Sequence, residues 1–286
     1  MSTKFFCRLA AFAAMSAFAC GASAWRIDMN FNNGTVGQKA QGSGGFSDAA
    51  GATYYTSENY YEGGKAAQLS ITKGDTAFGN WGGVINHPTL LKKGDQIWFR
   101  VRTYMPVGFN YNSTGEGGHL KFLRIHTQTT GGSNEGYDDW YINPKGSAIS
   151  HKFIFEGEQV WDEFASSQYA PDLGKWETYE FYVKFDNVPV SAGGTGRVRV
   201  WKDGVLLKDI TNRKTLATAS SVSDRTHLFT YWNGGAPATQ KMYVDDIVLT
   251  SDTPSAVDAK GNPYVGMGEG APVSVNPPSA PTLRLQ

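Results

Sequence analysis

The chain has 286 residues and little cysteine or charge. Its two cysteines, Cys7 and Cys20, both lie near the N-terminus. Charged residues make up 18%, and 26 Lys and Arg balance 26 Asp and Glu. A nucleic-acid binder needs a basic surplus, so this balance argues against that function. No apolar run beyond the N-terminus approaches the roughly 18 residues that span a bilayer, so we expect no membrane span.

Several catalytic motifs are also missing from the sequence. It contains no HExxH, P-loop or GxSxG pattern and no cysteine spacing typical of a metal site. It also lacks a Glu-x-Asp-x-x-Glu run, which would place three carboxylates on one strand face for retaining glycoside hydrolysis. Glycoside hydrolysis is therefore disfavoured, although carboxylates that are scattered along the chain can still pair in space.

The first 24 residues have the layout of a secretory signal peptide. Lys4 and Arg8 give a basic start, an apolar stretch follows, and an Ala-Ser-Ala cleavage site ends at Ala24. We therefore expect a secreted or periplasmic protein. A lipoprotein acylated at Cys20 is the alternative, which the residues before that cysteine disfavour. A chain that starts at Trp25 has no disulfide, so core burial must stabilise it.

Glycine and aromatic residues are abundant, with 34 Gly, 14 Tyr, 16 Phe and 8 Trp. This composition favours short strands and many turns, and helical periodicity is weak apart from one short helix expected at Asp162–Tyr169. About a dozen strands without covering helices predict an all-β fold, an antiparallel two-sheet β-sandwich of the jelly-roll type. We expect this domain over residues 25–252 and a Pro- and Gly-rich extended tail over residues 253–286. The expected strands are Trp25–Phe31, Ala66–Thr72, Gln96–Met105, His119–Thr127, Trp140–Ile142, His151–Glu156, Trp176–Phe185, Arg197–Trp201, Val205–Ile210, His227–Trp232 and Lys241–Thr250, with loops at Asn32–Gly51 and Gly131–Asp139.

The expected strand Gln96–Met105 carries a row of basic and aromatic residues. Alternation places Trp98, Arg100, Arg102 and Tyr104 on one side and an apolar set on the other. Guanidinium groups match carboxylate geometry, and flat aromatic rings match sugar rings. The row therefore predicts a surface that binds an acidic sugar. A solvated face with ordinary cross-strand pairs is the alternative.

The expected strand His119–Thr127 adds titratable groups. Arg124 and His126 lie two residues apart and project on one side, whereas simple alternation puts His119 on the other side. An Arg beside a His can neutralise a carboxylate while a proton leaves the neighbouring carbon, so the pair is a candidate catalytic centre. An ordinary hydrogen-bonded sheet histidine is the alternative for His126.

Later strands offer two further rows. Tyr182 and Lys184 alternate along one strand, and we expect them to face the same groove as Arg124, although an isolated lysine often points into solvent. Arg199 and Trp201 share a side of the following strand. These residues extend the expected sugar-binding surface.

The closing strand contains the adjacent acids Asp245 and Asp246. One of them must point toward the interior or an edge, and a buried carboxylate is costly unless it is paired or bound to a metal. Asp28 on the first strand offers a further oxygen, so a structural calcium ion is one expectation. Hydrogen bonds to a turn or to Lys241 are the alternative. No cofactor is expected to be required for catalysis.

The run RTYMPVGFNYNSTGEGGHLKFLRIH (residues 102–126) resembles the core of concanavalin A-like jelly-roll polysaccharide lyases. The shared features are Tyr104 and Pro106 at a strand end, Gly108-Phe109, and Gly117-Gly118 before a basic residue. The segments VRVWKDGVLL and MYVDDIVL resemble the closing hairpin and last strand of that superfamily. Those lyases place a lysine where this chain has His119.

The resemblance implies a lyase that cleaves a uronic-acid polysaccharide, such as alginate or a glucuronan, by β-elimination. Arg124 and Arg100 would neutralise the carboxylate, and His126 with Tyr182 or Tyr141 would act as base and acid. His119 occupies a position that is basic in those lyases. We expect a monomer whose partner is an acidic polysaccharide. The alternatives are a non-catalytic, lectin-like carbohydrate-binding protein and, less favoured, a glycoside hydrolase.

Overall fold

The computed structural model describes residues 24–40, 53–76, 82–112, 119–145, 148–164 and 169–268. Residues 1–23, which hold most of the expected signal peptide and both cysteines, lie outside these ranges, as do residues 269–286 of the expected tail. Among the described residues, no helix has the length and apolar character needed to cross a membrane.

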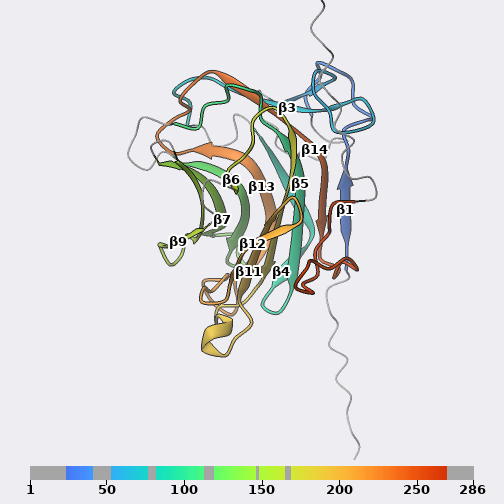
Figure 1. The fold of residues 1–286 in the computed structure, drawn as a ribbon. Coiled ribbons are helices and arrows are strands. Elements are labelled where there is room, and N and C mark those ends of the chain that lie inside the picture. The colour runs from blue at the N-terminus through green and yellow to red at the C-terminus, as the bar shows by residue number, and fades with distance from the viewer. Residues whose placement is uncertain are drawn as a thin grey trace, which may run out of the picture.

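The described strands form two antiparallel sheets, and Figure 1 shows them as two layers, with β5, β14 and β1 in one and β6, β7 and β13 in the other. The strands β6 and β7 bend along their length, with the hollow side of the bend turned away from the first sheet. The first sheet has the order β12 (Val205–Ile210), β11 (Arg197–Lys202), β10 (Trp176–Lys184), β5 (Gln96–Tyr104), β14 (Gln240–Thr250), β3 (Ala66–Ile71) and β2 (Thr53–Thr56), and β1 (Arg26–Met29) pairs with β14. The second has the order β4 (Gly83–Lys92), β13 (Val222–Trp232), β6 (Leu120–Gln128), β7 (Asn134–Lys145), β8 (Ala148–Phe155) and β9 (Val160–Phe164).

The predicted all-β sandwich is confirmed, and most of the expected strands lie within a residue or two of their positions. Two local expectations were wrong. The segment expected to be a short helix begins inside β9, and the polar loop expected at Gly131–Asp139 is largely the first half of β7. In both places an acidic residue interrupts the side that faces the core, because Asp138 pairs with Ile125 and Phe155 and Asp162 pairs with Phe153. The sequence therefore shows no continuous apolar run there.

The strands β2 and β4 were not expected from the sequence. The strand β4 contains Pro88, which normally argues against a strand because it cannot donate to the ladder. The structure places β4 at a sheet edge, and its pairing with β13 skips from Asn86 to Leu91. The proline therefore lies in a stretch that has no partner on β13, where its missing N–H group costs nothing.

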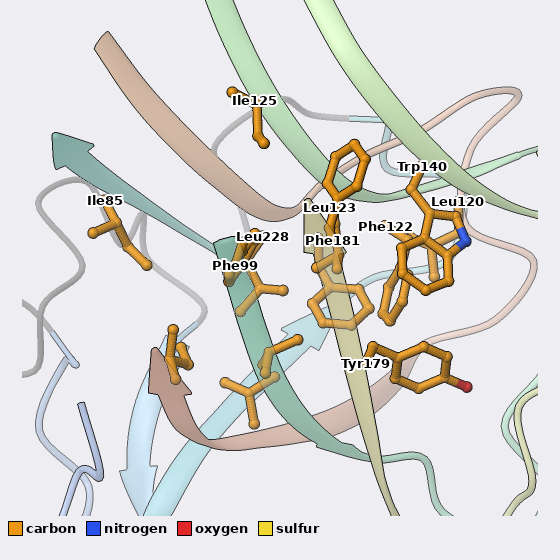
Figure 2. Close-up of a cluster of buried hydrophobic side chains, with 14 of the residues drawn as sticks. Ile85, Phe99, Leu120, Phe122, Leu123, Ile125, Trp140, Tyr179, Phe181 and Leu228 are labelled. Carbon is orange, nitrogen blue, oxygen red and sulfur yellow. The ribbon is translucent and has the colours of Figure 1, made fainter. Parts of the chain in front are cut away.

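Aromatic side chains from both sheets meet in the core (Figure 2). The Phe122 ring packs edge-on against Trp140 at 5.5 Å between centroids and against Tyr179 at 4.7 Å. Phe122 and Trp140 come from the second sheet and Tyr179 from the first, so these contacts join the two layers. Edge-to-face packing of this kind stabilises the fold beyond the contribution from burying the rings. All three side chains are fully buried.

We predict that Phe122→Ala lowers the free energy of unfolding by about 3–5 kcal/mol, because it removes a ring shared by both layers. Urea unfolding followed by tryptophan fluorescence measures the loss. Val205→Ala, at a position that is 49% exposed, is the control and should change the value by less than about 0.5 kcal/mol. Equal losses in the two variants would contradict the role assigned to Phe122.

Candidate functional site

Polar and charged side chains gather on the face of the second sheet that is turned away from the core, which we call the outer face. Residues that pair directly across neighbouring strands lie side by side on one face. One row of such pairs crosses five strands. It consists of Tyr231 on β13, Lys121 on β6, Tyr141 on β7, Lys152 on β8 and Glu163 on β9.

A β-bulge in β6 determines which residues reach this face. The pairing with β7 passes from Lys121 directly to Leu123, so Phe122 has no partner and is the extra residue. Phe122 and Leu123 consequently both point into the core. A bulge reverses the alternation that follows it. Lys121 therefore lies on the same face as Arg124, although simple alternation predicted opposite sides.

A buried ion cluster lies beneath the outer face. The Arg124 guanidinium donates to Asp139, with 2.7 Å between Nε and Oδ1, and to Glu156 at 3.2 Å. Lys121 Nζ lies 2.6 Å from Glu156 and 3.6 Å from Asp139. Burial alone lowers the pKa of Arg124, but Asp139 and Glu156 outweigh it and raise that pKa. Burial raises the pKa of Glu156, and the neighbouring Asp139 raises it further.

The predicted pair Arg124 and His126 shares this face, but both side chains are covered. Arg124 is 2% exposed, and the Tyr137 ring lies 3.7 Å from its guanidinium carbon. His126 is 1% exposed, and its Nδ1 is 2.5 Å from Asp224 while its Nε2 is 2.9 Å from Asn134. In this arrangement the polar atoms of both side chains are used in hydrogen bonds and ion pairs with neighbouring residues, so neither side chain offers a free polar group to a sugar.

His119, Lys121 and Tyr231 reach further toward solvent. The side chain of Lys121 is 13% exposed and lies between two rings, with Nζ 5.3 Å from the centroids of both Tyr141 and Tyr231. His119 is half-buried and packs against Tyr141 at 5.6 Å. Burial lowers the pKa of His119, and the nearby Lys152 and Lys121 lower it further. The imidazole is therefore neutral near pH 7 and able to accept a proton.

An exposed tryptophan covers the middle of the row. Trp161 on β9 is 41% exposed, and its ring lies 5.0 Å from Tyr141 and 5.4 Å from His119. Tyr141 is therefore only 2% exposed, and its hydroxyl donates to Asp139. Burial raises the pKa of Tyr141, and Asp139 and Glu156 raise it further, so the phenol keeps its proton.

The other predicted sugar-binding residues lie on the first sheet, on its face turned away from the core, and not with Arg124. The stretch from Asp258 to Met267, which we call the C-terminal segment, covers part of that face. Trp98 Nε1 donates to the Pro263 carbonyl at 3.1 Å, Arg100 donates to the Gly266 carbonyl at 3.1 Å, and Arg102 donates to the Met267 carbonyl. Trp201 donates to Asp258, and with Trp98 and Tyr182 it forms a small apolar cluster against Tyr264 and Val265.

The remaining predicted sugar-binding residues also have partners on the first sheet. Lys184 donates to the Gly94 carbonyl, and Arg199 pairs with Asp209 at 3.2 Å. Tyr104 packs against Trp176 and Tyr243. The expectation that Tyr182 and Lys184 face the same groove as Arg124 is therefore corrected, because Arg124 belongs to the other sheet.

The three aspartates expected to bind calcium are committed elsewhere. Asp246 bridges Arg100 and Arg102, each at 2.7 Å, and Asp28 pairs with Arg26 in solvent. Asp245 accepts backbone N–H groups, and burial raises its pKa to about 7. Within the described residues no three His, Cys, Asp or Glu side chains are arranged to hold a metal ion. These donors do not fit calcium.

Sequence reasoning missed Trp161 and Lys152 and did not single out Lys121 and Tyr231. The only sequence signal for Lys121 was that it lies two residues after His119, so alternation places both side chains on the same strand face. Trp161 was hidden inside the segment expected to be a helix. The bulge and the strand order that bring these residues together are properties of the folded sheets.

No protein-family model matches the chain, and no curated protein matches its sequence. The fold is similar to solved structures of polysaccharide lyases. Alginate lyase Aly36B is 16% identical with a TM-score of 0.51, over 78% of this chain and 96% of that chain. The endo-β-1,4-glucuronan lyase of the fungus Trichoderma reesei is 12% identical with a TM-score of 0.52, over 80% and 95%. Alginate lyase vAL-1 from Chlorella virus is 12% identical with a TM-score of 0.51, over 76% and 100%. The jelly-roll fold that the sequence resemblance implied is thereby confirmed.

We predict that Arg124→Met lowers the free energy of unfolding by about 3–5 kcal/mol, because it leaves Asp139 buried without its main partner. Urea unfolding measures the loss. The control is Arg26→Met, which breaks an exposed pair and should cost at most about 1 kcal/mol. The double variant Arg124→Met with Asp139→Leu should regain much of the loss, and a double variant less stable than Arg124→Met would contradict this explanation.

Proposed function

We propose that this protein is a polysaccharide lyase that cleaves a uronic-acid-containing polysaccharide by β-elimination. One observation carries the proposal: a neutral imidazole and an ammonium group both lie beside Tyr141 on the outer face of the second sheet, and a phenol lies on the other side of the ammonium group. They belong to His119, Lys121 and Tyr231. The fold similarity to alginate and glucuronan lyases supports the same reaction class.

Each group has one role in this reaction. The Lys121 ammonium pairs with the C6 carboxylate and so acidifies the proton on C5. His119 accepts that proton, the C5–H electron pair forms the C4=C5 double bond, and the C4–O bond breaks. Tyr231 donates its proton to the leaving oxygen. The products are a new chain end and an unsaturated uronate, and proton exchange with water restores both side chains.

The buried cluster prepares Lys121 for this role. An ammonium group has three donors, and Glu156 and Asp139 hold it from below. Arg124 and Lys121 balance the two carboxylates, so a sugar carboxylate meets no uncompensated negative charge. Arg124 and His126 are positioning residues in this proposal and do not touch the sugar.

The same carboxylates argue against a glycoside hydrolase. Hydrolases need two carboxyl groups about 5–5.5 Å apart for retention or about 6.5–9.5 Å apart for inversion, with the sugar between them. Asp139 and Glu156 are both held by Arg124 and Lys121, and Asp139 is fully buried. No sugar fits between them.

We expect His119→Ala to lower kcat by roughly 10²–10⁴-fold, the usual contribution of a general base. The assay follows the ultraviolet absorbance of the unsaturated uronate over a panel of acidic polysaccharides. Tyr231→Phe should also lose activity. The matched control is Tyr182→Phe, under the C-terminal segment, which should keep it. A protein that is retained on polyuronate gels but releases no unsaturated product with any polymer would instead be a carbohydrate-binding protein.

The pKa of His119 also predicts a pH profile. The base works only when it is unprotonated, so kcat/KM falls as the pH drops through the pKa of His119 in the free enzyme. Because that pKa is lowered, the acid limb should lie below the ordinary histidine value of about 6.5. Rates at constant ionic strength measure the limb. A limb above pH 6.5 would contradict His119 as the base.

A further inference from the structure

The row that crosses the outer face contains a second lysine. Lys121 and Lys152 are separated by one strand, because both pair directly with Tyr141 from opposite sides. Neighbouring strands are about 4.8 Å apart, so the two lysine positions are roughly 9.5 Å apart across the sheet. The row thus sets two cations at a fixed spacing along a line perpendicular to the strands.

Lys152 has donors to spare. Its nearest acid is Glu163, with 3.8 Å between Nζ and Oε2, and the Glu163 side chain is 49% exposed. Such an exposed pair is weak. Among the described residues Nζ makes no hydrogen bond, and the Lys152 side chain is 19% exposed. The Lys152 ammonium group can therefore give up its weak pair with Glu163 and bind the carboxylate of a ligand.

An aromatic surface lies beside both cations. Lys152 Nζ is 5.8 Å from the Trp161 ring, and that ring packs against Tyr141, which lies between the two lysines. Trp161 keeps 41% of its surface exposed, a large share for a tryptophan. A flat, exposed ring next to two ammonium groups fits a sugar ring that is flanked by acidic sugars.

We propose that Lys152 and Trp161 form a second carboxylate subsite, which makes the protein specific for runs of uronates. The inference rests on the proposed function. An extended 1,4-linked pyranose chain advances by about one strand spacing per sugar. When Lys121 holds the carboxylate of the reacting sugar, Lys152 therefore meets the carboxylate two sugars away. The sugar between them stacks on Trp161, and the chain crosses the strands toward β9.

The test compares wild type with Lys152→Gln, Lys152→Arg and the control Lys208→Gln, which changes an exposed lysine on the first sheet. The substrates are a polyuronate and the same polymer with part of its carboxylates reduced to alcohols. We expect Lys152→Gln to raise KM for the intact polymer roughly 3- to 10-fold, since one charge-assisted contact is lost. Lys152 also lowers the pKa of His119, so kcat is compared at a pH above the acid limb, where it should be unchanged. Lys152→Arg should stay near wild type. The difference should shrink on the reduced polymer and at about 1 M salt.

Retardation in gels that contain the polyuronate is measured in parallel, so the subsite is judged even without turnover. A Lys152→Gln variant that matches Lys208→Gln in KM and in retardation overturns the subsite while leaving the lyase proposal intact. Wild type that is retarded but releases no unsaturated product contradicts the lyase proposal alone, and the retardation of Lys152→Gln then decides the subsite. Wild type that neither binds nor cleaves the polymer overturns both.

Discussion

The buried pair between Arg124 and Asp139 is the interaction on which the rest of the outer face depends. Arg124 is almost without solvent contact, and Asp139 is completely buried, so neither charge is tolerable alone. Asp139 in turn accepts the Tyr141 hydroxyl and lies near the Lys121 ammonium. Through these contacts one ion pair fixes the residues that lie above it. The polar surface is therefore rigid at its centre, which lowers the entropy lost when a ligand binds.

Much of the fold could be predicted, because β-strands and turns have recognisable local sequence patterns. The alternation along Gln96–Tyr104 and the Asp-Gly turn before β12 each mark an element without outside information. The strand β4 has no such pattern, because its proline is tolerated only at an edge that the sequence does not reveal. The chain's expected ends, the signal peptide and the last part of the tail, lie outside the described residues.

The candidate site was harder to predict, because it depends on which strands become neighbours. Alternation along the strand correctly predicts that Arg124 and His126 project together. Arg100 and Trp98 were assigned to the same surface, because their strand also alternates cations and aromatic rings on one side. The structure separates the two rows, because Trp98 and Arg100 lie on the first sheet and bind the chain's own C-terminal segment. Strand order decides which sheet each row belongs to, and the bulge at Phe122 brings Lys121 onto the same face as Arg124.

The pairing of β1 with β14 has a consequence for how the protein acquires its structure. Arg26 pairs with Thr250, so the first and last strands of the domain are neighbours, and the Trp25 backbone N–H donates to Ser251. Contacts between such distant positions close late, because a long loop must be ordered before they form. The first sheet cannot be completed until almost the whole domain has been synthesised. Slow folding, with β-strand edges exposed in the interval, is the expected behaviour of this topology.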